Sequence, residues 1–160
     1  MIKTITLFLL TFCFILLGCE QKRKFLSVGD NAPRFSLLDL NGNTVSLNDL
    51  LKGKEVILNF WASWCPECRQ QMPVLNEFAK RYNNKIEIVG INVGESKKLA
   101  TNFTREIKVE YKILLDSKGE VARVYGVIGV PTNVLINKEG LIKNLNLDVR
   151  GTESYLRQNN

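Results

Sequence analysis

The chain has 160 residues, of which 45% are hydrophobic and 24% are charged, and its net charge is +6. This length predicts one domain that is large enough to bury a single core. The positive charges are spread along the chain except for residues 22–24, which follow an apolar segment, so we expect a linker facing lipid headgroups and no nucleic-acid partner.

The chain begins with an export signal. The apolar run 5–17 is shorter than the ~20 residues that span a bilayer as a helix. It ends in the sequence LLGC at Cys19, which resembles the lipobox of bacterial lipoproteins. The resemblance implies a signal peptide over 1–18, lipid on Cys19, a tether over 19–27 and an exported domain over 28–160. The alternative is an ordinary or uncleaved signal, which also exports the domain.

Predicted strands and helices alternate from residue 28 onward. Asn41-Gly42 predicts the turn of a β-hairpin, and Ser46 with Asp49 resembles a capping box that starts a short helix. The remaining predicted elements are strands at 56–60, 86–93 and 113–115, helices at 66–83 and 120–125, a helix capped by Ser96 whose apolar face carries Leu99, Phe103 and Ile107, a hairpin at 133–145 and a final helix capped by Thr152. This order predicts an α/β domain with a mixed sheet.

Two cysteines separated by two residues lie where the strand 56–60 is followed by a helix. The unpaired N–H groups of a helix N-terminus favour the thiolate form of Cys65. Pro66 suits the first helical turn, where its missing N–H costs no hydrogen bond. Cys68, one turn further, is close enough to attack a mixed disulfide formed at Cys65. The motif therefore predicts dithiol–disulfide chemistry that uses this redox-active disulfide and no other cofactor.

Two structural interpretations compete with redox activity. A structural zinc site needs four ligands, but the chain has no histidine, and its other cysteines are Cys13 and Cys19 near the N-terminus. A static disulfide between residues three apart closes a very short loop and stabilises little. We therefore predict no metal site and expect the pair to cycle between dithiol and disulfide.

The sequence resembles a known fold at two separate motifs. Residues 60–68 (FWASWCPEC) together with residues 125–132 (YGVIGVPT) resemble thioredoxin-fold proteins. Residues 29–35 (GDNAPRF) and an additional segment at about 95–119 are similar to the membrane-anchored TlpA/ResA-like thiol–disulfide oxidoreductases of bacterial cell envelopes. The resemblance implies a mixed central sheet flanked by helices, with an N-terminal β-hairpin and an inserted helix-strand segment.

The resemblance also implies roles for individual residues. Cys65 corresponds to the attacking thiol and Cys68 to the buried resolving thiol. Pro131 corresponds to a cis-proline that faces the pair, which leaves the backbone of Val130 able to bind an extended substrate strand. An ordinary trans-proline loop is the alternative. Trp64 is expected at the rim of the site, with plain core packing as its alternative.

Three polar residues qualify the resemblance. Asn59 occupies the position where thioredoxins carry a buried aspartate, and Gln71 a position where some members of the subfamily carry glutamate. Neither amide accepts a proton, so the proton acceptor for Cys68 is not evident. The negative charge of Glu67 should raise the pKa of the Cys65 thiol, which favours the oxidised form and makes the protein a reductant.

We therefore expect an exported, lipid-anchored, monomeric reductase of client cysteine pairs that is re-reduced by a membrane electron donor. The resemblance points to cytochrome c maturation as one setting. A thiol peroxidase is disfavoured by Ala62 and Leu58, where peroxiredoxins carry threonine and proline. A copper-delivering Sco-like protein needs a histidine and a wider cysteine spacing. A lipoprotein that only binds partners is the remaining alternative.

Overall fold

The computed structural model describes residues 26–148. The predicted signal peptide, Cys19 and the final helix capped by Thr152 lie outside this range. No helix within the range is long and apolar enough to cross a membrane. The elements are β1 (Ser36–Asp39), β2 (Thr44–Ser46), α2 (Leu47–Leu50), β3 (Glu55–Trp61), α3 (Pro66–Arg81), β4 (Ile86–Val93), α4 (Lys97–Glu106), β5 (Lys112–Asp116), α5 (Glu120–Val124), β6 (Thr132–Ile136) and β7 (Ile142–Asn144).

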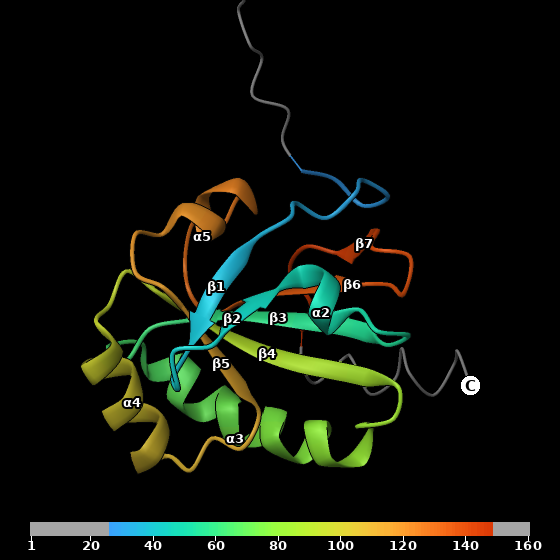
Figure 1. Ribbon diagram of the computed structural model, residues 1–160. Helices are drawn as coiled ribbons and strands as arrows, with labels where there is room; N and C mark the ends of the chain where they lie inside the picture. Colours follow the sequence, from blue (N-terminus) through green and yellow to red (C-terminus); the bar gives the residue numbers. More distant parts are fainter. Residues whose placement is uncertain (1–25, 149–160) are drawn as a thin grey trace, which may run out of the picture.

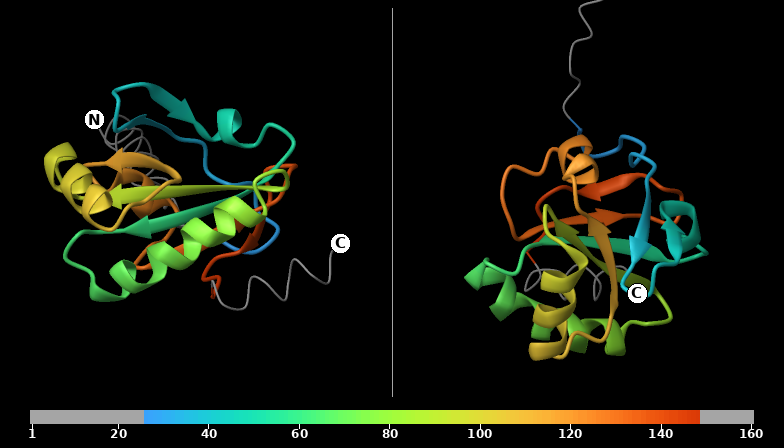
Figure 2. Two further views of the ribbon diagram at one scale, coloured as in Figure 1. Left: turned by 90° about the horizontal axis from the view of Figure 1, so that it is seen from below. Right: turned by 60° about the vertical axis from the view of Figure 1, so that its left-hand side comes forward.

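The strands form one mixed sheet in the order β2-β1-β5-β4-β3-β6-β7. The central strands β3, β4 and β5 are parallel, while the hairpins β1–β2 and β6–β7 extend the sheet at its two ends. Helices α3 and α4 lie on one face of the sheet, and α2 and α5 lie on the other (Figure 1; Figure 2). The predicted α/β, thioredoxin-like fold is confirmed, including the N-terminal hairpin and the additional segment α4–β5.

Two short sequence motifs form the predicted β1–β2 turn and the start of α2. Asp39 accepts hydrogen bonds from the backbone N–H groups of Asn41 and Asn43, and Gly42 adopts the positive φ of 91° that the hairpin turn requires. Ser46 and Asp49 form the predicted capping box at the start of α2. The hairpin and the first helix are therefore determined by nearby residues.

Alternate residues of β3 supply two separate cores. Ile57 and Trp61 pack beneath α3 and α4, whereas Leu58 and Phe60 pack on the opposite face with α2 and α5. Burial on both faces is expected for a central strand with a parallel neighbour. Helix α3 closes the first core with one apolar face, which includes Met72, Leu75 and Phe78. The packing fixes the end of β3 and the start of α3, between which Cys65 lies.

The buried face of α4 differs from the prediction. Leu99 is 52% exposed, and the buried residues are Ala100, Phe103 and Thr104. The prediction for Leu99 is wrong because an i, i+4 pattern of large apolar residues ignores Ala100, which is small enough to lie against the sheet. Phe103 orients the helix, since its ring stacks on that of Trp61 with centroids 5.2 Å apart.

Candidate active site

The two motif cysteines form a disulfide at the junction of β3 and α3. Cys65 is the N-cap of α3, and Pro66 occupies the first helical position. Cys68 lies one turn into the helix, and its Cα atom is 5.3 Å from that of Cys65. The pair therefore occupies the strand-to-helix junction that the sequence predicted.

The sulfur of Cys65 lies against the N-terminus of α3. Its Sγ atom accepts a hydrogen bond from the backbone N–H of Cys68 at 3.1 Å. A donor of this kind favours the thiolate once the disulfide is reduced. Glu67 is exposed in the same helical turn, where its negative charge acts in the opposite direction. Cys65 is 2% exposed and Cys68 is fully buried, so a client must reach into the surface to contact Cys65.

The loop before β6 approaches the disulfide from a second direction. β6 pairs with β3 so that Thr132 lies opposite Phe60, which brings the preceding loop to the same end of the sheet as the motif. The Val130–Pro131 peptide bond is cis, as the resemblance implied. The carbonyl oxygen of Val130 lies 3.5 Å from the Sγ atom of Cys65. Residues 65 positions apart in sequence thus form one site.

An apolar pocket of about 200 Å³ shares Val130 with the site, although neither cysteine lines it. Its walls include Trp64 from the motif turn and residues 127–130 from the loop before Pro131. Every described residue that lines the pocket is apolar or glycine. Trp64 is 72% exposed and Ile128 is fully exposed, whereas Trp61 is fully buried. Trp61 therefore packs in the core, whereas Trp64 lies at the rim of the pocket.

Three amide side chains form a network on the α3 side of β3. The Nδ2 atom of Asn59 donates to Oε1 of Gln71 at 3.0 Å and to Oδ1 of Asn133 at 2.8 Å. The Nδ2 atom of Asn133 donates to Oε1 of Gln71 and to the carbonyl of Leu147, both at 3.2 Å. Gln71 follows Cys68 by three residues, so the network lies along the same side of α3 as the second cysteine. None of these amides ionises.

Sequence reasoning missed two residues around the site, Asn133 and Glu95. Asn133 lies opposite Asn59 in the β3–β6 pair. Glu95 follows β4, which runs parallel to β3 with Asn92 opposite Trp61, and its carboxylate binds Ser63. Because neighbouring parallel strands end at the same edge of a sheet, an acidic residue shortly after β4 was a signal that could have identified Glu95.

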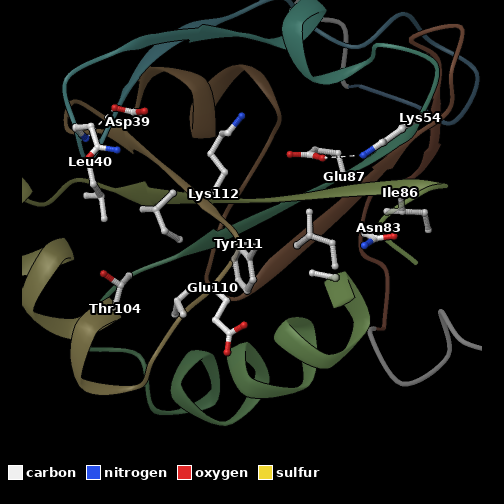
Figure 3. Close-up of a pocket in the computed structure, with 15 residues that line it drawn as sticks. Asp39, Leu40, Lys54, Asn83, Ile86, Glu87, Thr104, Glu110, Tyr111 and Lys112 are labelled. Atoms are coloured by element: carbon white, nitrogen blue, oxygen red, sulfur yellow. Dashed lines mark hydrogen bonds and ion pairs between the residues drawn. The ribbon is translucent and has the colours of Figure 1, made fainter. Parts of the chain in front are cut away.

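Other features lie apart from this site. Among residues 26–148, no group of three or more His, Cys, Asp or Glu side chains could hold a metal ion. A cavity of about 580 Å³ lies between the β1–β2 turn, the C-terminal part of α3, the start of β4 and the segment before β5 (Figure 3). Its lining includes the ion pair of Lys54 and Glu87 at 3.5 Å, and none of the predicted site residues described by the structure.

Comparison with known proteins identifies the family. The sequence matches the AhpC/TSA family over residues 28–145. The chain belongs to this family. Two proteins named thiol-disulfide oxidoreductase ResA are similar: that of Bacillus cereus is 36% identical over 126 residues, covering 78% of this chain and 72% of the relative. That of Bacillus subtilis is 40% identical over 121 residues, covering 75% and 67%.

Solved structures are similar to this chain as well. A putative thiol:disulfide interchange protein DsbE from Chlorobium tepidum has a TM-score of 0.74 and 34% identity, over 83% of this chain and 95% of that one. These comparisons confirm the TlpA/ResA-like resemblance. With the disulfide between Cys65 and Cys68, they identify the chain as a thiol–disulfide oxidoreductase.

Proposed function

We propose that this oxidoreductase reduces disulfides in client proteins at the extracytoplasmic face of a bacterial membrane. The observation that carries the proposal is the position of the Cys65–Cys68 disulfide, which lies at a helix N-terminus beside Val130 and an apolar pocket. An apolar pocket can hold a client side chain, and a helix N-terminus favours the thiolate that attacks the client disulfide.

The reaction consists of two exchanges. The thiolate of reduced Cys65 attacks one sulfur of the client disulfide, which forms a mixed disulfide and releases the first client thiolate. The thiolate of Cys68 then attacks the Cys65 sulfur, which forms the Cys65–Cys68 disulfide and releases the second client thiolate. Two electrons pass to the client, and a membrane dithiol donor returns two electrons to the enzyme. The enzyme needs no further cofactor for either step.

The client binds as an extended strand across the loop before β6. The backbone of Val130 lies beside Cys65 and serves the strand as a hydrogen-bonding partner. Trp64 and Ile128, both exposed, border the pocket that receives an apolar client side chain near the reacting cysteine. Trp64, Pro66, Glu67, Val130 and Pro131 therefore shape the site, and Cys65 and Cys68 perform the chemistry.

The lipobox resemblance at Cys19 supports an enzyme that is tethered to the membrane through lipid, and we propose that this enzyme is a monomer. The names of the ResA and DsbE relatives support clients with cysteine pairs. We propose apocytochrome c, with two cysteines that must be reduced, as the first client to test. Insulin serves as a general disulfide substrate.

Trapping the intermediate tests the mechanism. Without its resolving thiol, reduced Cys68→Ser should accumulate a mixed disulfide with a peptide whose two cysteines are joined in a disulfide, and Cys65→Ser should form none. Absence of an adduct in Cys68→Ser contradicts the assignment of Cys65 as the attacking thiol. Mass spectrometry under non-reducing conditions detects the adduct.

The reduction potential tests the direction of electron flow. Equilibration with thiol buffers should give a potential near that of thioredoxin, roughly −270 mV. A value near that of DsbA, roughly −120 mV, would show that the enzyme inserts disulfides and that the interpretation of Glu67 is wrong.

A further inference from the structure

Glu95 is a buried carboxylate close to the redox motif. It lies between the end of β4 at Val93 and the N-cap of α4 at Ser96, and it is 9% exposed. The other buried acid among the described residues is Asp116, whose two oxygens cap the backbone N–H groups of Glu120 and Ala122 at the start of α5. Asp116 thus has a local structural role, whereas Glu95 also receives hydrogen bonds from a distant part of the chain.

The carboxylate of Glu95 binds the turn that precedes Cys65. Its Oε2 atom accepts from the backbone N–H of Ser63 at 2.7 Å and from Nδ2 of Asn92 at 2.7 Å. Its Oε1 atom accepts from the hydroxyl of Ser63 at 2.5 Å. Two of the three hydrogen bonds therefore hold Ser63, 32 residues away in sequence. Hydrogen bonds to a carboxylate are among the stronger ones in proteins.

Ser63 lies in the short turn that leads to the reacting sulfur. The turn connects Trp61, which is fixed in the core, to Cys65 at the N-cap of α3. Within the turn, the structure shows one backbone hydrogen bond, from Cys65 N–H to the Ala62 carbonyl at 3.2 Å. The Glu95 contacts therefore restrain a short connection with few hydrogen bonds of its own. Both the Cys65 sulfur and the exposed ring of Trp64 depend on that restraint.

We propose that Glu95 is a positioning residue for Cys65. It holds the Ser63 turn so that the Cys65 sulfur stays at the N-terminus of α3, and it acts through hydrogen bonds rather than through its charge. The proposal rests on the proposed role of Cys65 as the attacking thiol. An amide in place of the carboxylate can accept from the Ser63 and Asn92 N–H donors and donate to the Ser63 hydroxyl, so it preserves all three contacts.

The decisive comparison is between Glu95→Ala and Glu95→Gln in the full chain. Both variants lack the charge, and they differ in whether the hydrogen bonds to Ser63 are retained. In a Cys68→Ser background, Cys65 should react with iodoacetamide about tenfold more slowly in Glu95→Ala than in Glu95→Gln, because small displacements of reacting groups cost large factors in rate. Glu95→Gln should react as fast as the protein with Glu95 intact, or faster, since removing a nearby negative charge favours the thiolate.

Equal rates in the two neutral variants overturn the proposal. If both variants react as fast as the protein with Glu95 intact, Glu95 has a purely structural role, even if Glu95→Ala melts at a lower temperature. If both variants react slowly, the hydrogen bonds of Glu95→Gln fail to rescue the rate. If Glu95→Ala does not fold, Ser63→Ala removes one of the contacts and should slow alkylation in a folded protein; an unchanged rate there also overturns the proposal. Insulin reduction by the protein with Glu95 and both cysteines intact tests the proposed function separately.

Discussion

The two cysteines of the motif have surroundings of different chemistry. Along the side of α3 that carries Cys68, neutral amides of Asn59, Gln71 and Asn133 bind one another. At the turn before Cys65, a buried carboxylate from Glu95 receives hydrogen bonds. The difference shows where the fold accepts a buried charge: next to backbone and hydroxyl donors in a turn, and not within the amide network near the resolving cysteine.

Energetics explain why the amide network is neutral. A buried ionised group without full compensation costs several kcal/mol, whereas hydrogen-bonded amides cost much less. The network still leaves Oδ1 of Asn59 without a hydrogen-bond partner among the described residues. Its remaining hydrogen bonds therefore matter, because each one that is lost leaves another buried polar atom without a partner.

Removing Asn133 should have the largest effect on stability. Asn133→Ala deletes an acceptor for Asn59 and donors to Gln71 and to the Leu147 carbonyl. Because buried partners are left unsatisfied, we expect unfolding to become easier by about 1–3 kcal/mol. Urea denaturation measures the change. Asn146→Ala, at an exposed position, is the matched control and should change stability by less than about 0.5 kcal/mol. Equal effects of the two substitutions would contradict the importance of the network.

A fourth amide, Asn76, allows stability to be tested separately from reactivity. Asn76, on α3, donates to the Lys108 carbonyl at 2.8 Å and accepts from the Glu110 N–H at 2.9 Å, away from the cysteines. Asn76→Ala should cost about 1–2 kcal/mol of unfolding free energy, since two hydrogen bonds are lost. The rate of insulin reduction should stay unchanged below the melting transition. A slower rate would mean that the thiols respond to the general stability of α3, which would weaken the comparison.

Local sequence patterns predicted most of the fold, and long-range contacts account for what they missed. The hairpin, the capping box and the start of α3 at Pro66 depend on neighbouring residues, so they could be predicted from short motifs. Asn133 and Glu95 contact partners 74 and 32 residues away, and no local pattern records those pairings. Leu99 was misplaced because the stacking of Phe103 on Trp61 leaves Ala100, and not Leu99, buried against the core.

Gln71→Glu, which places a charge in the amide network, should have the smallest effect on stability. It should also have the most specific effect on the chemistry of Cys68. Gln71 is only half-buried, unlike Asn59 and Asn133, and two N–H donors already point at its Oε1 atom. A carboxylate at this position would therefore be both hydrogen-bonded and partly solvated, and we expect Gln71→Glu to lose less than about 1 kcal/mol. Once ionised, the new carboxylate disfavours a second negative charge nearby. The pKa of the Cys68 thiol should therefore rise.

The ultraviolet absorbance of the thiolate, followed against pH in a background with Cys13, Cys19 and Cys65 all replaced by Ser, measures the pKa of Cys68. Gln70→Glu is the matched control, because it adds the same charge one residue earlier on an exposed part of α3 and should leave that pKa nearly unchanged. If both variants shift the pKa of Cys68 equally, the added charge acts from a distance through solvent, and its place in the amide network does not matter. If Gln71→Glu alone shifts it, the neutrality of the network is what keeps the resolving thiol available for the second exchange.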